Sequence, residues 1–207
     1  MRGTWAAATM ATAVIVLAGC SGEPAPDGAP SGTGPHDTPK ARAEVACPDA
    51  LVEAEGDKES GGWTPADRDV DLEPFDAAWL CEYSWANATP DTGGESSPWT
   101  LQGDPAPIVD ADLAALSDAL GALELWTDRA DEIVCTLDLG PTWMLILADG
   151  ESLTGVTFEE FGCGFARLTD DPYSTAPGQS RTLPAGSYLG GDVLREIQRL
   201  AGVTPRR

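Results

Sequence analysis

Alternating hydrophobic and polar positions predict the first strand of the folded part of this chain. Within Ala78–Trp85 the odd-numbered positions place large side chains on one face of a strand: Trp79, Cys81, Tyr83 and Trp85. The opposite face would hold Leu80, Glu82 and Ser84. A period of two is typical of a strand with one buried face. We therefore expect a half-buried strand here, with Trp99–Leu101 as a short partner.

A second group of strands is expected around an Asp-Gly pair. Thr142–Ala148 reads TWMLILA and is apolar at both odd and even positions, which predicts a central strand with two covered faces. Asp149-Gly150 follows it and precedes the run ESLTGVTF. An Asp-Gly pair between two such runs predicts a β-hairpin. Cys163–Leu168 can add a third strand.

Two helices are expected from hydrophobic residues at helical spacing. Asp110 can cap the first, whose inward residues would be Leu113, Leu116, Leu120 and Leu123. The second covers Asp192–Ala201, with Gly202 as its stop and Pro205 beyond; its inward residues would be Val193, Ile197 and Leu200. The order strands, helix, strands, helix predicts an α+β domain with an antiparallel sheet and two packed helices.

The amino-terminal hydrophobic run has the form of an export signal. One charge, Arg2, precedes an apolar stretch from Ala6 to Ala18, which is shorter than the roughly 20 residues that a membrane span needs. The run ends in Leu17-Ala18-Gly19-Cys20, which resembles the bacterial lipobox. We therefore expect residues 1–19 to be a signal peptide and Cys20 to receive the lipid. Two acyl chains would anchor the protein stably to a membrane.

The residues after Cys20 divide into a linker and a domain. Residues 21–44 hold no large apolar side chain, so burial cannot offset the entropy of ordering them. With the lipidated Cys20 they form a predicted linker over 20–44, with an end-to-end distance of roughly 27 Å. Residues 45–204 are long enough for a single domain with its own core.

Net charge restricts the classes of partner. The chain carries 12 basic and 34 acidic residues and a net charge of −22. Nucleic acid phosphates and anionic headgroups would both repel it, so no nucleic acid partner is expected, and the lipid must hold the protein at the membrane. The expected location is the outer face of the cell membrane. The partner, an envelope protein or a small ligand, is left open.

Four cysteines remain once Cys20 is assigned to the lipid. An even number in an exported chain predicts disulfides, with three possible connectivities for four cysteines. We favour Cys47–Cys81 and Cys135–Cys163, because the second pair would join the predicted hairpin to the strand after it. The cysteines lack CxxC spacing and a nearby histidine, so neither a metal site nor a cofactor is expected.

Several of these residues resemble two groups of known proteins. Uncharacterised actinobacterial lipoproteins with two disulfides are similar at Cys47-Pro48, Cys81-Glu82-Tyr83, and the stretch from Cys135 through Ala148-Asp149-Gly150 to Gly162-Cys163. That resemblance implies a structure and no activity. Subtilisin-inhibitor-like proteins are similar at Cys135-Thr136, Pro141, Leu145, Leu147, Gly150, Val156, Phe158 and Cys163. That resemblance implies protease inhibition, with Leu137–Leu139 as the candidate loop, although the wide spacing of Cys47 and Cys81 departs from it.

Catalytic chemistry has few candidate residues. The single histidine, His36, lies in the linker, which excludes a Ser-His-Asp or Cys-His arrangement in the domain. Lys58 is the only lysine beyond the linker, which disfavours Ser-Lys catalysis. Paired carboxylates could still perform acid–base work. The candidates by residue type are Glu159, Glu160, Asp170 and Asp171.

Two other patterns allow a ligand site. The carboxylates at Asp67, Asp69, Asp71 and Glu73 resemble the start of a calcium loop, but Leu72 and Ala78 stand where an EF-hand needs Gly and Glu. Three tryptophans could stack on a sugar or a peptide, although such residues mostly pack in cores: Trp63, Trp99 and Trp126. These residues together favour a non-enzymatic binding or interaction domain. A protease inhibitor and a carboxylate-dependent hydrolase remain the alternatives.

The lipid anchor can be tested directly. Replacing the lipidated thiol in C20A should abolish incorporation of a fatty acid and leave the protein unprocessed or released, because the acyl chains have no other attachment point. Metabolic labelling with an alkyne fatty acid measures this. Labelling of C20A at the level of the native chain would contradict the assignment.

Overall fold

The protein folds around one antiparallel sheet. The computed structural model describes residues 47–53, 64–85, 99–126, 135–136 and 140–205. The seven strands in sequence order are β1 (Ala77–Trp85), β2 (Trp99–Ile108), β3 (Glu124–Leu125), β4 (Thr142–Asp149), β5 (Ser152–Glu159), β6 (Phe165–Thr169) and β7 (Tyr188–Leu189). Their order across the sheet is β2-β1-β4-β5-β6-β7-β3. The predicted α+β class, with two helices and two disulfides, is confirmed.

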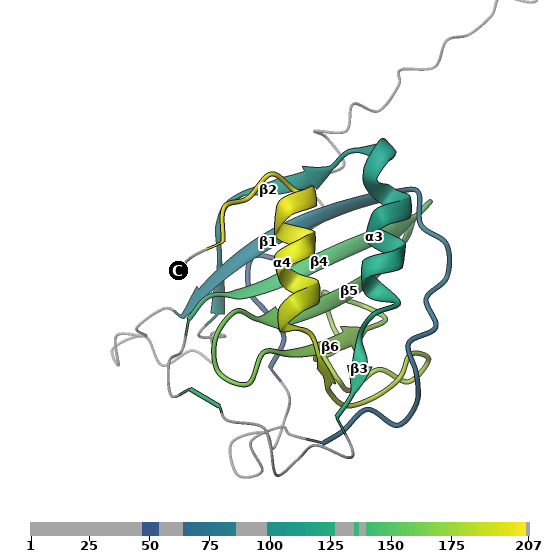
Figure 1. The fold of residues 1–207 in the computed structure, drawn as a ribbon, viewed down its shortest axis with the longest axis vertical. Helices are drawn as coiled ribbons and strands as arrows, with labels where there is room; N and C mark the ends of the chain where they lie inside the picture. The colour runs from purple at the N-terminus through teal and green to yellow at the C-terminus, as the bar shows by residue number, and fades with distance from the viewer. Residues whose placement is uncertain (1–46, 54–63, 86–98, 127–134, 137–139, 206–207) are drawn as a thin grey trace, which may run out of the picture. The chain divides into compact units, whose positions relative to one another are not determined.

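Both helices lie on one face of the sheet, in front of it in Figure 1. α3 (Leu113–Leu120) buries Leu116 and Leu120, and α4 (Gly191–Leu200) buries Val193, Ile197 and Leu200. They pack on a core that includes Leu80, Leu145, Leu147, Val156, Phe158 and Leu168. Among the described residues, no helix is long and apolar enough to span a membrane.

The start of the first helix differs from the expectation. Asp110 opens a 3₁₀ turn, η1 (Asp110–Asp112), and its side chain caps neither that turn nor α3. α3 ends at Leu120, so Leu123 lies beyond the helix although it is still buried. The leucine spacing predicted three buried residues correctly, Leu116, Leu120 and Leu123, while Leu113 is partly buried. A tighter first turn and a shorter helix replaced the capped one.

The opposite face of the sheet is apolar as well. Trp79, Cys81 and Tyr83 of β1 form a second core cluster with Met144 and Ile146 of β4. Leu80 of β1, which faces the helices, is 1 % exposed. The predicted half-buried strand is therefore wrong over most of β1, because both of its faces are covered. β4, apolar on both faces as predicted, lies inside the sheet between β1 and β5.

Two segments cover this second face. The 47–53 strip contributes Cys47 and Leu51 to the second cluster. From the other side, the loop after β6 reaches β5: a Cβ on Gly155 would lie 3.4 Å from the side chain of Pro172 in this loop, and 2.7 Å from that of Thr169, its partner at the end of β6. Glycine at this position therefore lets the loop pack closely on the sheet.

The hairpin between β4 and β5 forms where it was expected, with its turn displaced by one residue. Asp149 pairs with Ser152 as the last rung of the ladder, so the two turn residues are Gly150 and Glu151 rather than Asp149 and Gly150. Gly150 has φ 58°, which a first turn residue of type II′ requires. The left-handed conformation thus falls on the one residue of the pair that adopts it without strain.

β2 forms one edge of the sheet and is longer than the predicted Trp99–Leu101. Its register against β1 shifts at a bulge, where Gly103 has φ 67°. Pro105 and Pro107 follow in the same strand, and neither can donate a backbone hydrogen bond. Prolines at alternate positions of an edge strand discourage pairing with another chain.

The loop between β6 and β7 is held by Asp170. Its Oδ2 accepts hydrogen bonds from the Thr182 hydroxyl at 2.7 Å, the Thr182 amide at 3.2 Å and the Arg181 amide at 3.3 Å. Partial burial alone would raise the Asp170 pKa, but these bonds and one from Ser180 outweigh it and lower the pKa to about 2. The carboxylate thus closes the loop in its charged form.

The two disulfides should differ in their reaction with a reductant. Cys47 and Cys81 are 7 % and 0 % exposed, whereas Cys135 and Cys163 are half-buried. A limiting amount of dithiothreitol on the native protein should therefore open Cys135–Cys163 first, because thiolate attack needs access to a sulfur. Differential alkylation and peptide mapping measure the order. Opening of Cys47–Cys81 before Cys135–Cys163 would contradict this.

Asp170 should make part of the stability depend on acidic pH. Its folded pKa lies below its ordinary value of 3.8, so its contribution is complete above about pH 4 and is lost as the pH falls towards 2. D170N should reduce the free energy of unfolding by about 1 kcal/mol at pH 7 and flatten its decline between pH 4 and 2. Urea titrations across that range measure both effects. An unchanged slope in D170N would show that other carboxylates cause the acid dependence.

Candidate functional site

A pair of tryptophans stands at the end of the β1–β2 ribbon where β1 finishes and β2 begins. Trp85, the last residue of β1, lies directly opposite Trp99, the first residue of β2. Their ring centroids are 5.4 Å apart and their planes meet at 85°, an edge-to-face arrangement. Trp99 packs against the second core cluster, whereas Trp85 is 46 % exposed. The pair therefore joins a core anchor to a solvent-facing indole.

The 47–53 strip runs alongside Trp99 at the outer edge of β2. Leu51 donates its amide hydrogen to the Trp99 carbonyl at 3.1 Å, and Leu101 donates to the Asp49 carbonyl at 2.9 Å. The strip is held from beneath by the Cys47–Cys81 disulfide. Asp49 and Glu53 on this strip are both exposed. Two carboxylates are thus placed on the strip that borders the tryptophan pair.

A buried hydrogen bond attaches the strip to β1. The hydroxyl of Tyr83, a side chain with 0 % exposure, donates to the Pro48 carbonyl at 2.8 Å. Burial raises the Tyr83 pKa, and the charges of Tyr173 and Asp49 add to that rise. Burial followed by the charge of Asp49 likewise raises the pKa of Tyr173, which is 47 % exposed. The charge of Asp49 therefore acts on both phenol groups, Tyr83 and Tyr173.

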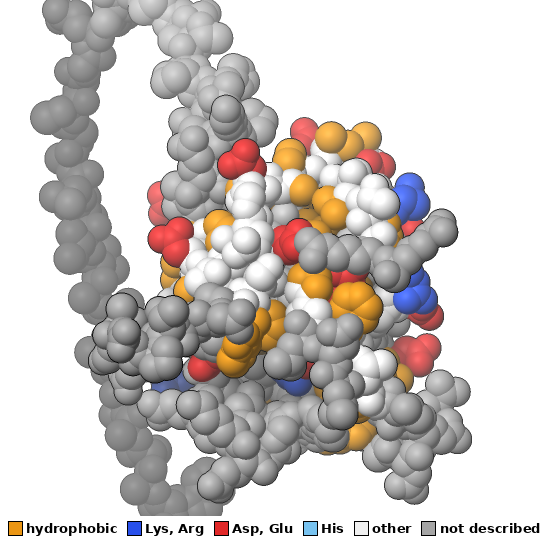
Figure 2. Space-filling model, turned by 90° about the vertical axis from the view of Figure 1, so that its left-hand side faces the viewer, with side chains coloured by type: hydrophobic (Ala, Val, Ile, Leu, Met, Phe, Trp, Pro, Cys, Tyr) orange, Lys and Arg blue, Asp and Glu red, His pale blue; other side chains and the backbone are white. Residues whose placement is uncertain are grey.

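We call Trp85, Trp99, Asp49 and Glu53 together the tryptophan corner. In the described part of the chain three large hydrophobic side chains are strongly exposed, Trp85, Tyr173 and Val109, and two of them lie close to the 47–53 strip. Figure 2 shows the side of the molecule on which β1 ends: hydrophobic side chains reach the surface between carboxylates, and basic side chains lie at the right-hand margin and in the lower part of the view. The corner combines aromatic faces with negative charge, which suits contact with a cationic or neutral group.

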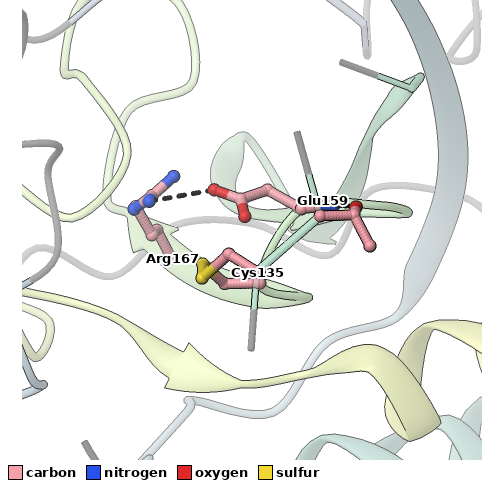
Figure 3. The surroundings of a disulfide bond; sticks show 6 residues. Cys135, Glu159 and Arg167 are labelled. Atoms are coloured by element: carbon pink, nitrogen blue, oxygen red, sulfur yellow. Dashed lines mark hydrogen bonds and ion pairs between the residues drawn. A yellow bond between two sulfur atoms is a disulfide. The ribbon is translucent and has the colours of Figure 1, made fainter. Parts of the chain in front are cut away.

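A second constellation surrounds Arg167 on the sheet face opposite the helices. Arg167 Nη2 lies 3.0 Å from Glu159 Oε1, and its Nε donates to the Ser187 hydroxyl at 2.9 Å. Its guanidinium also lies 5.9 Å from the Phe165 ring centroid. Figure 3 shows the Arg167 and Glu159 side chains pointing towards each other beside Cys135. The pair joins β5, β6 and the residue before β7, so its role is structural.

The first two candidate carboxylates do not form a catalytic pair. Glu159 is bound by Arg167, whereas Glu160 Oε2 accepts the Trp143 indole N–H at 2.8 Å. Trp143 belongs to the core beneath the helices, on the other side of the sheet from Arg167. Neighbouring residues of an extended chain point to opposite faces, so the two carboxylates diverge.

The other two candidate carboxylates are bound within their own loop. Asp170 accepts bonds from Arg181 and Thr182, as described above. Asp171 accepts the Tyr173 amide at 2.9 Å and the Ser174 hydroxyl at 2.5 Å. Those two bonds, with Tyr173 and Ser174, keep the Asp171 pKa low. An open depression of about 330 Å³ lies beside Asp170, lined also by Ser174, Thr175, Ala176, Gln179 and Arg181.

The predicted calcium-loop segment runs in an irregular, partly extended path. Asp67 lies next to Arg68 in an ion pair of 3.4 Å and hydrogen bonds through its amide to Ala185. No helix precedes or follows Asp67–Glu73 within the described residues 64–76, as an EF-hand would require. The described residues also contain no group of three or more potential metal-ligating side chains.

The remaining candidates have mixed outcomes. Trp126 is buried and stacks on Phe165 with ring centroids 5.2 Å apart, so it packs in the core. Of the two predicted stacking residues that the structure describes, Trp99 is the one that contributes to an exposed aromatic surface. The other sequence candidates lie outside the described residues: Cys20, His36, Lys58, Trp63 and the proposed inhibitory loop Leu137–Leu139.

Three residues of the tryptophan corner were missed or misplaced by sequence reasoning: Trp85, Asp49 and Glu53. The alternating pattern assigned Trp85 to the buried face together with Tyr83. Its position in the sequence could have indicated exposure, because Trp85 immediately precedes a polar run rich in Gly, Pro and Ser, which is typical of the end of a strand. Asp49 and Glu53 had no such indication, because their place beside β2 depends on pairing between distant segments.

Comparison with known proteins returned no relative. No protein-family model, curated protein or solved structure matches this chain. What the protein does has therefore to be inferred from its own surface chemistry, of which the tryptophan corner is the most distinctive part.

Proposed function

We propose that this protein is a lipid-anchored extracytoplasmic binding domain that contacts its partner through the tryptophan corner. The observation on which this rests is the Trp85–Trp99 pair, with Trp85 46 % exposed at the end of the β1–β2 ribbon. Tryptophan is enriched among the residues that dominate binding energy at protein interfaces. An edge-to-face pair also holds the exposed indole in one orientation, so little side-chain entropy is lost on binding.

The cross-links of the domain support an extracytoplasmic location. Both pairs of cysteines, Cys47–Cys81 and Cys135–Cys163, are joined. Disulfides form and persist in oxidising compartments outside the cytoplasm. A lipid on Cys20 and a linker with a reach of roughly 27 Å would then hold the domain at the membrane with its surface free to meet a partner.

The placement of the ionisable groups favours binding over hydrolysis. Each of the four carboxylates considered for acid–base work accepts a structural hydrogen bond or ion pair: Glu159, Glu160, Asp170 and Asp171. A general acid needs a pKa raised towards neutral, and the pKa values of Asp170 and Asp171 move the other way. The tryptophan corner, by contrast, offers aromatic and acidic side chains that can bind a partner without a chemical step.

Site-specific photo-crosslinking tests this proposal in the full-length lipidated protein. A benzophenone amino acid at Val52, a part-exposed residue of the strip beside the corner, should give a discrete crosslinked product in intact envelopes. Adding W85A should remove that product, since loss of an interface hot spot costs about 2 kcal/mol or more of binding energy. The same change should lower the free energy of unfolding by only about 1 kcal/mol, because it removes one aromatic contact.

The matched control uses another exposed hydrophobic residue. Val109 is 58 % exposed and lies at the far end of β2 from Trp99. A benzophenone at position 109 should give no discrete product, and V109A should leave the Val52 product unchanged. A Val52 product that persists in W85A, or a product at position 109 alone, would show that the partner binds elsewhere.

A further inference from the structure

The angle between the two indoles restricts what the corner can hold. Because the planes meet at 85°, a group placed in the angle between them can lie against a face of each ring, and Trp85 is the more exposed of the two. A compact cation can contact both faces in this way, as in aromatic cages that bind ammonium groups. Consecutive sugar rings or a flat ring system need aromatic platforms that lie parallel to one surface. The geometry therefore favours a point-like cation over a glycan chain.

The charges around the corner agree with this choice. Asp49 and Glu53 are exposed on the strip that pairs with the Trp99 end of β2. The ion pairs of the described arginines are formed with other carboxylates: Asp67, Glu159, Asp192 and Glu196. The whole chain has a net charge of −22, so a cationic partner is attracted over long range and an anionic one is repelled.

Resting on the proposed function above, we propose that the tryptophan corner receives a lysine ammonium or arginine guanidinium group from a partner polypeptide. The indole faces of Trp85 and Trp99 contact the cation and the methylenes that precede it. Asp49 and Glu53 supply the opposite charge at the rim. The partner is therefore a basic segment of a polypeptide, and the acidic surface around the corner raises its rate of encounter.

The test uses the mature lipidated chain in neutral detergent and peptides of defined charge. The probes are repeat peptides of Gly-Lys, Gly-Glu and Gly-Ser, together with a soluble N-acetylglucosamine oligomer as the glycan. The readout is the indole ¹H–¹⁵N resonance of Trp85, assigned by its absence in W85F. The Gly-Lys peptide should shift this resonance saturably, and its affinity should fall as NaCl rises from about 50 to about 300 mM.

Variants with a matched charge change separate the corner from general attraction. W85A should weaken Gly-Lys binding about 10-fold, followed through the Trp99 indole, and D49N/E53Q about 5-fold. D118N/E151Q changes the net charge by the same amount at exposed positions on α3 and in the β4–β5 turn, at the other end of β4 from Trp85. It should weaken binding less than 2-fold, and V109A should have no effect.

Several outcomes would overturn the cation assignment. These are equal weakening by D118N/E151Q and D49N/E53Q, a Trp85 shift produced by Gly-Ser or by the glycan at the same affinity, or no shift with any probe. If one of these results is obtained and the crosslink at Val52 nevertheless forms and is lost in W85A, the binding function stands and the partner is not basic. If that crosslink is also absent, the proposed function fails as well.

Discussion

Strands β1 and β4 carry apolar side chains on both faces, so neither face of the sheet can be left in water. Two helices cover one face, with Leu116, Ile197 and their neighbours packed on Leu80 and Leu145. The other face has no helix to cover it among the described residues. The 47–53 strip and the loop after β6 cover it instead. The contacts that attach these two segments to the sheet therefore determine which side chains are exposed on that side.

The strip has too few residues to cover the face through its own contacts. Two apolar side chains, Cys47 and Leu51, reach the second core cluster. The Cys47–Cys81 disulfide and the hydrogen bond from the buried Tyr83 hydroxyl to Pro48 supply the remaining attachment. A cross-link over this separation of 34 residues stabilises a fold by about 3–4 kcal/mol. The same attachment places Asp49 and Glu53 beside Trp99, so the means of covering the core also builds the proposed binding surface.

The carboxylates of the protein have different roles in different parts of the structure. Asp170 and Asp171 close a loop, and Glu159 with Arg167 joins two strands near the second disulfide. Asp49 and Glu53 lie at the surface beside exposed aromatic rings. A binding role for the corner depends on this separation: carboxylates bound by local amides and arginines have little left to offer a ligand, whereas those on the strip face outward.

The amino-acid sequence by itself determined the local features of this protein. The spacing of apolar residues in α3 and α4, the doubly apolar β4 and the hairpin after it follow from periodicity and turn chemistry within a few residues. The disulfide pairing favoured from the sequence also agrees with the structure. The lipobox at Cys20 is likewise a local pattern, and it stays a prediction, because Cys20 lies outside the described residues.

Only the tertiary structure decided which of these residues meet. The pattern that buries Trp79 and Tyr83 assigned Trp85 to the same face, but the core ends before Trp85 and leaves it exposed. Glu159 and Glu160 look like a pair in sequence, yet the pleat of the strand sends them to opposite faces. Asp49 and Trp99 lie far apart in the chain and become neighbours through the Cys47–Cys81 cross-link and the pairing of Ala50 with Thr100. Periodicity reports which face of an element is apolar, whereas exposure and proximity depend on what covers that face, and the covering segments come from distant parts of the chain.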